Sequence, residues 1–285
     1  MTTNSSEQRS NSFHFAWDWP SRFTILLFGA TLGLLATSWA YLISISEGRS
    51  SIFSKETLNR TNAFVNELLG VRSDSWSHAN WSELVGLASD TIAMSVIASV
   101  MAGTAALAII PLATRKSSHV SRGVVSRIAF AMARFSFIFT RAVPELLWAL
   151  IIIFVISPGI LAGAVALAIH NFGVIGRLGA DTIEDLDDAP ITALRSSGAS
   201  STQRYFTGVL PLAARQLVTF QLYRWEVIIR TTAVVGFVAA SGIGYQLRLD
   251  MSLFRYAEVG QLLLAYLVIV WVIDLLSVMV RRSIR

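Results

Sequence analysis

The chain has 285 residues, of which 54% are hydrophobic and 14% are charged, with a mean hydropathy of +0.58, so the composition excludes the ordinary soluble classes and predicts a membrane protein. The absence of cysteine excludes disulfide scaffolds, thiolate metal sites and cysteine nucleophiles. The net charge of +5 comes with no basic helix or RNA-binding motif, so we expect no nucleic-acid partner.

The first predicted span is residues 23–45, which contain no charged side chain. As a helix, this stretch is long enough to cross about 30 Å of hydrocarbon. Residues 1–22 before it are polar, and no small-residue cleavage pattern follows it. We therefore expect a cytoplasmic N-terminus and a retained anchor instead of a removable signal peptide.

Residues 46–88 are expected to form the main external loop. Trp76 and Trp81 are suited to the headgroup level of the membrane. Between residues 64 and 69, apolar side chains recur at helical spacing, which predicts a short helix on the membrane surface. These apolar positions are Phe64, Val65, Leu68 and Leu69.

Two further apolar runs, residues 91–114 and 259–280, are uncharged except for Asp274. The region between residues 128 and 178 is compatible with one span or with two spans that turn at residues 157–159, where Pro-Gly is a turn signal. Six spans place the basic tail, residues 281–285, on the same side as the other basic loops, as the positive-inside bias requires. The six predicted helices are 23–45, 89–113, 127–156, 160–178, 210–240 and 259–280, with both termini cytoplasmic.

This topology places a polar segment, residues 181–208, in the cytoplasm. Asp187 and Asp188 followed by Pro190 predict the start of a short helix that Gly198 ends. The next short helix is expected to open with a capping box and to carry an apolar stripe. The capping box is Ser200 with Gln203, and the stripe is Tyr205, Phe206 and Val209.

On pattern alone, an ordinary re-entry loop with an interfacial helix explains this segment equally well. However, "ALRSSGAS" (193–200) and "GVLP" (208–211) resemble the EAA loop of ABC importer permeases, a short cytoplasmic element that docks into the ATPase. Its leading Glu-Ala-Ala is not preserved, because Ile191 and Thr192 stand there. The resemblance implies an ATPase-coupling role for Ala193, Arg195, Gly198, Ala199, Ser200, Leu210 and Pro211.

Three more stretches resemble the phosphonate importer permeases (PhnE-like), namely "TRAVPELLWALIII" (140–153), "ALAIHNFGVIGRLGADTIE" (166–184) and "IIRTTAVVGFVAASGIGYQL" (228–247). The last one has Ser241 where the family usually has glycine. The resemblance implies an all-α membrane fold of the type I importer (MetI-like) class, with a permease core over residues 89–280. It also implies alternating-access import of phosphonate or a related phosphorus oxyanion.

The partners that the resemblance implies are a second copy of the chain, two ABC ATPase subunits and an external substrate-binding protein in a bacterial cytoplasmic membrane. ATP and Mg would be bound by the ATPase subunits, because this chain has no phosphate-binding loop. We expect no catalytic residue, no metal site and no cofactor in the chain itself, and lipid around it.

Ionisable residues inside spans usually face a pathway or one another. Arg141 with Glu145, and Glu226 with Arg230, have the i,i+4 spacing of ion pairs, and Asp274 is expected to pair with an arginine of a neighbouring span. The surplus of arginine predicts an anion pathway, since guanidinium groups match phosphate-like oxygens, although salt bridges between helices explain each arginine alone. The predicted pathway or gate residues are Arg141, Glu145, His170, Asn171, Arg224, Glu226, Arg230 and Ser241.

Rival functions remain open at this point. Phosphite, hypophosphite and phosphate permeases share these features, and methionine or amino-acid permeases are more distant alternatives. A channel or secondary transporter needs no docking helix. An intramembrane enzyme is disfavoured, because "SSGAS" (196–200) lies in a loop without histidine and the four histidines share no helix face.

Overall fold

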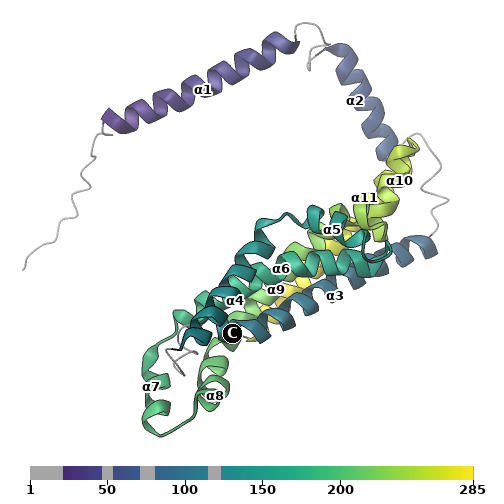
Figure 1. Cartoon of the computed structure of the whole chain (residues 1–285). Coiled ribbons are helices and arrows are strands. Elements are labelled where there is room, and N and C mark those ends of the chain that lie inside the picture. The colour runs from purple at the N-terminus through teal and green to yellow at the C-terminus, as the bar shows by residue number, and fades with distance from the viewer. Residues whose placement is uncertain (1–21, 47–53, 71–80, 115–122, 285) are drawn as a thin grey trace, which may run out of the picture. The chain divides into compact units, whose positions relative to one another are not determined.

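A computed structural model of the chain describes residues 22–46, 54–70, 81–114 and 123–284, and every regular element in these ranges is helical (Figure 1). The chain divides into two compact units, Met1–Ala63 and Phe64–Arg285. The expectations for the polar N-terminus, Trp76, the basic loop at 115–122 and Arg285 fall outside the described residues.

The first unit contains the predicted first span. Helix α1 (Arg22–Ser46) covers it, and its side chains between residues 22 and 44 are exposed except for the half-buried Thr24. An apolar helix of this length whose described side chains are mostly exposed is typical of a segment whose solvent is lipid.

Helix α2 (Lys55–Leu68) confirms the helix that the sequence predicts around residue 64. In the second unit, the ring of Phe64 packs edge-to-face on Tyr256 at 5.0 Å, and Leu68 joins an apolar cluster that includes Leu262. Leu69 and Val65 are exposed. The apolar side of this short helix is therefore divided between packing and an exposed surface.

Of the described helices, four are long and apolar enough to cross a membrane, and two bent pairs raise the number to six. The four are α1, α3 (Trp81–Ala113), α6 (Ile160–Glu184) and α11 (Tyr256–Ile284). The bent pairs are α4 (Val124–Ala142) with α5 (Glu145–Ile153), and α9 (Leu210–Ala239) with α10 (Gly242–Ser252).

Helix α6 is the centre of the second unit and packs against α3, α4, α5 and α9 (Figure 1). Its buried face consists largely of alanine and glycine. A Cβ placed on Gly173 would lie 2.6 Å from the carbonyl oxygen of Phe137, so the backbones of α4 and α6 meet there. Gly176 and Gly179 are also in close contact with neighbouring helices, through the side chains of Phe137 and Ile110 respectively.

The expected single helix at 127–156 is wrong. The chain bends by 92° between α4 and α5, because Pro144 has no N–H to continue the hydrogen-bond ladder and its ring disfavours helical backbone at Val143. Two side chains satisfy carbonyls near the break: Trp148 Nε1 donates to the oxygen of Thr140 at 3.0 Å, and His170 Nδ1 lies 3.0 Å from the oxygen of Val143. The expected turn at 157–159 is confirmed, with φ of +151° at Gly159.

A second bend, of 56°, separates α9 from α10. Ala240 has left-handed backbone with φ 55° at this point, and Gly242 follows with φ 65°. The bend is held from outside, because Thr91 Oγ1 accepts the N–H of Ile243 at 2.9 Å and Ala239 O accepts the N–H of Gly159 at 2.7 Å. The sequence predicted no helix between residues 240 and 259, where α10 lies.

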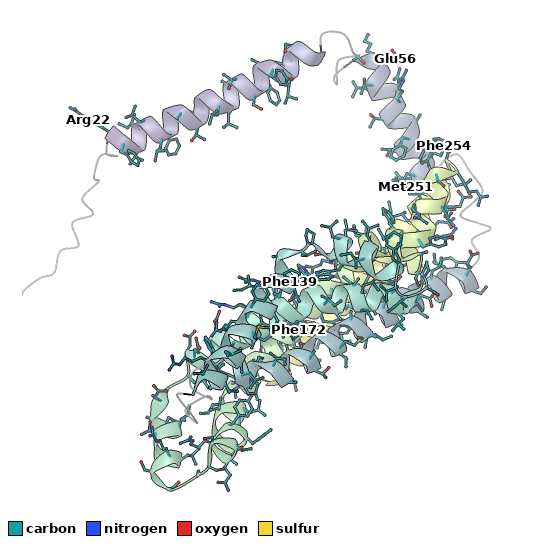
Figure 2. The ribbon with its side chains drawn as sticks, viewed as in Figure 1. Arg22, Glu56, Phe139, Phe172, Met251 and Phe254 are labelled. Atoms are coloured by element: carbon teal, nitrogen blue, oxygen red, sulfur yellow. The ribbon has the colours of Figure 1, made fainter. Side chains whose placement is uncertain are left out.

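The apolar core follows the length of the bundle. Phe137 on α4 is fully buried and packs edge-to-face on Phe172 of α6 at 5.1 Å. Figure 2 shows Phe139 and Phe172 on the helices of this bundle, while Met251 and Phe254 extend from its α10 end, where both are exposed. Helices α7 and α8, described below, lie at the opposite end of the bundle (Figure 1).

Candidate functional site

The candidate coupling segment begins with α7 (Asp188–Ser196), whose start follows the sequence prediction. Asp187 is the N-cap, and its Oδ1 accepts the N–H of Ala189 at 3.1 Å. Pro190 stands in the first turn, where a missing N–H costs no helical hydrogen bond. Upstream, α6 continues to Glu184, so the segment leaves the bundle later than residue 181.

Gly198 ends α7 with φ +84°, as predicted. The Gly198 N–H donates to the oxygen of Arg195 and the Ala199 N–H to that of Leu194, both at 3.1 Å. This pair of bonds is a Schellman motif, which requires a left-handed residue at the position of Gly198. A Cβ placed there would meet nothing within 4 Å, so the requirement for glycine comes from the backbone alone.

The predicted capping box is confirmed at the start of α8 (Ser201–Arg204). Gln203 N donates to Ser200 Oγ at 3.3 Å, and Ser200 N donates to Gln203 Oε1 at 2.9 Å. The π-helical turn η2 (Tyr205–Val209) then joins α8 to α9. Gly208 sits in this turn against the side chain of Leu194, which fixes the two short helices to each other.

One side of the coupling segment is anchored in the bundle. Ile191, Tyr205 and Val209 are buried in the same apolar cluster as Ile110 and Ile183. Of the predicted apolar stripe, Tyr205 and Val209 are buried, whereas Phe206 is 61% exposed.

The other side of the segment is presented to its surroundings. Among the predicted coupling residues, Ala199 and Leu210 are half-buried and the rest are exposed, namely Ala193, Arg195, Gly198, Ser200 and Pro211. Their coupling role remains a prediction, to which the structure adds a protruding polar surface with a fixed backbone.

Beneath this segment, an ion-pair network ties three helices together. Arg134, with a side chain only 13% exposed, reaches Asp181 at 2.9 Å and Glu184 at 2.8 Å, and its Nε donates to the oxygen of Ala113 at 2.8 Å. Arg177 adds a second contact to Asp181 at 2.7 Å. Arg134 is not among the predicted pathway residues. The i,i+3 spacing of Asp181 and Glu184 is the signal in the sequence that points to a shared cationic partner.

Four of the predicted pathway residues form one polar cluster at the break between α4 and α5: Glu145, His170, Asn171 and Arg224. Arg224 Nε donates to Asn171 Oδ1 at 2.5 Å, and His170 Nε2 lies 3.5 Å from Glu145 Oε2. Arg224 also interacts with the charge of Glu145. Three helices thus bring a guanidinium, an imidazole, an amide and a carboxylate together at the break.

The other predicted pathway residues lie elsewhere, and both expected i,i+4 ion pairs are wrong. Glu226 pairs with Arg281 of α11 instead of Arg230. Arg230 pairs with Asp274 at 2.6 Å, which confirms the expectation that Asp274 pairs with an arginine of a neighbouring span. Arg141 makes no salt bridge with Glu145 in the described part of the chain, because the helix breaks between them.

Ser241 is buried at the bend between α9 and α10, and its side chain makes no capping bond there. A Cβ on Gly236 would lie 2.7 Å from the oxygen of Ser241. The backbones of α9 and α10 therefore cross in direct contact at this point, and Ser241 contributes its main chain to the crossing.

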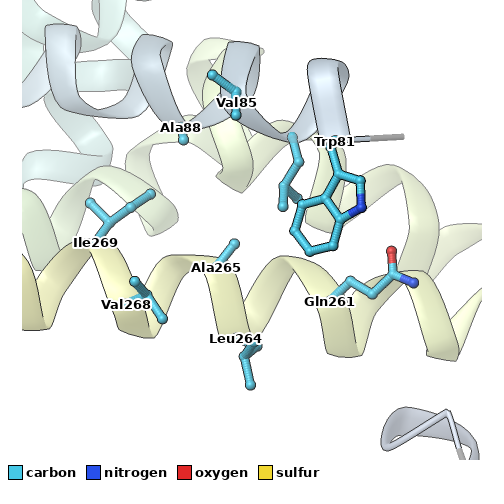
Figure 3. A pocket seen from close by; sticks show the side chains of 9 residues that line it. Trp81, Val85, Ala88, Gln261, Leu264, Ala265, Val268 and Ile269 are labelled. Atoms are coloured by element: carbon cyan, nitrogen blue, oxygen red, sulfur yellow. The ribbon is translucent and has the colours of Figure 1, made fainter. Parts of the chain in front are cut away.

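Two apolar hollows accompany the bundle. One, of about 300 Å³, lies between the start of α3 and α11, with Trp81 and Gln261 at one end and Val268 and Ile269 towards the other (Figure 3). The other, of about 250 Å³, lies among α3, α6 and α9 and includes Gln221. Neither is lined by a charged side chain, so the polar cluster at the break remains the candidate anion site.

Comparison with known proteins gives one family match. Residues 123–285 match the family described as "Binding-protein-dependent transport system inner membrane component". A phosphite transport system permease protein of Stutzerimonas stutzeri is 33% identical over 193 residues, covering 68% of each chain. A phosphate-import permease protein of Mycolicibacterium smegmatis is 32% identical over 69% of this chain and 36% of its own.

A putative cryptic phosphonate transport system permease protein of Escherichia coli K12 is 33% identical over 41% of this chain and 96% of its own. Among solved structures, the MetNI methionine ABC transporter in inward-facing conformations matches with a TM-score of 0.59 and 19% identity, over 71% of this chain and 96% of the other. An amino acid ABC transporter solved with histidines matches with a TM-score of 0.60 and 19% identity, over 73% and 97%. Both solved structures share the fold of this chain over the matched part.

Proposed function

Since the chain belongs to the binding-protein-dependent transport system inner membrane components, we propose that this permease subunit imports phosphonate or a related phosphorus oxyanion. Its all-helical fold is that of type I ABC importer permeases. The names of its sequence relatives, phosphite, phosphate and phosphonate permeases, are the reason to place the substrate among phosphorus oxyanions ahead of methionine or other amino acids.

The observation that carries the coupling part of the proposal is the two-sided segment α7–Gly198–α8. Ile191, Tyr205 and Val209 anchor it in the bundle, while the residues around Arg195 and Gly198 stay exposed. A short element that is rigid by its caps and packed onto several spans transmits a push as a rigid body. Closure of an ATPase around it would therefore move α3, α6 and α9 together, as alternating access requires.

The anion part of the proposal rests on the polar cluster. Arg224 offers a fork of N–H donors suited to paired oxygens. Its present partner, the Asn171 amide, is neutral, so an oxyanion competes with a weaker hydrogen bond and not with a salt bridge at that contact. Nearby Glu145 opposes tight retention of the anion, which a permease must release.

The remaining partners follow from the same family. A second copy of the chain completes the pathway, two ATPase subunits that bind ATP and Mg dock at the coupling segments, and an external binding protein delivers the substrate. The assembly lies in the lipid of a bacterial cytoplasmic membrane. Helix α11 ends at the end of the bundle that carries α7 and α8 (Figure 1), which supports a cytoplasmic C-terminus if the ATPase docks there.

Because the chain has no native cysteine, an introduced cysteine is its only thiol in a crosslinking test. Ser196→Cys on α7 should crosslink to a single-cysteine ATPase subunit, whereas Ser252→Cys at the end of α10 should not, although both serines are exposed. A membrane-impermeant maleimide should label the first from the cytoplasm and the second from outside. Equal crosslinking from both sites, or labelling of Ser196→Cys from outside, would refute the coupling role.

Substrate class is tested separately, with uptake into proteoliposomes that contain the permease, its ATPase and its binding protein. Uptake of a labelled phosphorus oxyanion is measured in the presence of unlabelled phosphonate, phosphite, phosphate or methionine as competitor. We expect inhibition by at least one phosphorus oxyanion and none by methionine. The reverse result would keep the permease role and reject the proposed substrate.

A further inference from the structure

One side chain joins the ends of two helices to a third helix beneath the coupling segment. Arg134 of α4 donates from Nε to the oxygen of Ala113, the last residue of α3, at 2.8 Å. Its two terminal nitrogens reach Asp181 at 2.9 Å and Glu184 at 2.8 Å, both in the last turn of α6. A guanidinium presents its donors in a rigid planar fork, so these three contacts fix the orientation of Arg134 as well as its position.

Both helix ends are stabilised by this side chain. The last carbonyls of a helix have no partner within the helix and carry partial negative charge, and neither α3 nor α6 has a basic residue in its last turn. Helix α6 adds two carboxylates there, Asp181 and Glu184, where the helix dipole disfavours them. Arg134 offsets this cost from a different helix, with a side chain that is only 13% exposed.

Arg177 makes a similar contact without joining two helices. It reaches Asp181 at 2.7 Å, but both residues lie on α6 with i,i+4 spacing. Such a pair stabilises its own helix by a small amount. Two guanidinium groups therefore share one carboxylate, one of them within α6 and the other from α4.

The contacts of Arg134 lie where the coupling segment leaves the bundle. Glu184 is the last residue of α6 and stands three positions before Asp187, the N-cap of α7. Apolar contacts of Ala133 and Phe137 also hold α4 in this region, but apolar attraction has no preferred direction. The hydrogen bonds of the fork weaken steeply when they are bent, so Arg134 fixes where α4 sits along α6.

Helix α4 extends from this point to the break that carries the polar cluster. At about 1.5 Å per residue, Val143 lies roughly 13 Å along the helix from Arg134. Neighbouring helices bind the far end, because Trp148 donates to the oxygen of Thr140 and His170 contacts the oxygen of Val143. A shift of α4 at Arg134 therefore reaches the polar cluster.

We propose that Arg134 is a positioning residue that links α4, and through α4 the polar cluster, to the coupling segment. When an ATPase displaces α7, the end of α6 moves with it, and the fork of Arg134 makes α4 and the end of α3 follow. Arg134 thus acts on the candidate anion site from a distance, through a helix. This inference rests on the proposed function for the ATPase and for the transported anion.

Transport tests the link with two matched variants. Arg134→Lys keeps the positive charge but cannot hold three acceptors in a planar fork, and Arg177→Lys makes the same exchange at the ion pair within α6. Uptake per ATP hydrolysed is measured in the assembled complex with its ATPase and binding protein, so a loss of stability alone does not change it. Arg134→Lys should lower this ratio about tenfold, the factor that one lost charge-assisted hydrogen bond corresponds to, whereas Arg177→Lys should stay within about twofold of the wild type. An unchanged ratio in Arg134→Lys, or an equal fall in both variants, overturns the proposal.

Spin labels test the same link without transport. They are placed at Ser196→Cys on α7 and Met132→Cys on α4, both exposed positions. When the complex binds ATP, the distance between the labels should stay constant with Arg134 present and should change with Arg134→Lys. A change with Arg134 present, or no change with Arg134→Lys, overturns the proposal. If the labels behave as expected but no phosphorus oxyanion is carried, the proposed substrate fails and the mechanical link stands.

A second variant covers the case in which Arg134→Lys does not assemble. Glu184→Gln keeps an oxygen acceptor of the same size for Arg134 and removes only the charge of that contact. It should lower uptake per ATP in the same direction, by a smaller factor. An unchanged ratio in Glu184→Gln in that case overturns the proposal, and failure of both variants to assemble overturns it by assigning the cluster to folding.

Discussion

Replacing Gly198 by valine tests whether the backbone of the coupling segment matters for coupling. Its φ of +84° belongs to the left-handed region, where an L-residue costs about 1–2 kcal/mol and a β-branched one lies at the upper end. At about 2 kcal/mol, the native segment geometry becomes roughly 30-fold less favoured relative to alternatives.

The matched control is Gly198→Asn. Asparagine tolerates left-handed backbone because its short polar side chain bonds locally, so its cost should stay under about 1 kcal/mol. Since a Cβ at this position meets nothing within 4 Å, neither substitution disturbs the packing of α7 or the insertion of the spans. The two variants therefore differ mainly in backbone strain.

The assay is ATP hydrolysis and substrate uptake by the reconstituted complex. The valine variant should assemble and hydrolyse ATP, but lose most uptake and most stimulation by the binding protein, while the asparagine variant should retain at least half of both. Equal uptake by the two variants would refute the reasoning that the Schellman backbone transmits the ATPase motion. Failure of the valine variant to assemble would assign Gly198 to folding instead.

Three further outcomes are expected. Arg134→Met should lower the free energy of unfolding by about 2–3 kcal/mol in thermal melts, because Asp181 keeps Arg177 but the carbonyl of Ala113 loses its side-chain donor, whereas a loss below about 1 kcal/mol would mean that the network is solvated. Gly173→Val should cost about 1–3 kcal/mol by forcing α4 from α6, measured by the same melts, and no change would contradict the backbone contact. Arg230→Met should cost about 1 kcal/mol, and the exchange Arg230→Asp with Asp274→Arg should recover the yield of folded protein if their pairing is structural. Full assembly of Arg230→Met with impaired uptake would instead place Arg230 on the pathway.

The break at Pro144 was not predicted, although proline is a known signal for the end of a helix. Proline was plain in "AVPELLW" (142–148), but the apolar run on both sides favoured a continuous span. A proline inside a membrane helix either kinks it or ends it, and the choice depends on whether other groups satisfy the freed carbonyls. Here Trp148 and His170 satisfy them, and neither contact follows from composition.

The sequence by itself determined the features whose bonds are local. The membrane class follows from the amount of apolar side chain, the turn at 157–159 follows from Pro-Gly, and the caps at Asp187, Gly198 and Ser200 join groups two to five residues apart. Such bonds depend on backbone geometry that neighbouring residue types alone establish.

Only the tertiary structure decided which ionisable groups meet. Glu226 had a suitable partner one turn away, yet it pairs with Arg281, which is 55 residues distant, and Arg230 pairs with Asp274 across 44 residues. An i,i+4 ion pair on a helix surface contributes only about 0.2–0.5 kcal/mol. An ion pair between two helices that packing brings together contributes more. The register of α9 on α11 and of α5 on α6 therefore selects the pairs, and the polar cluster exists because three helices cross at the break.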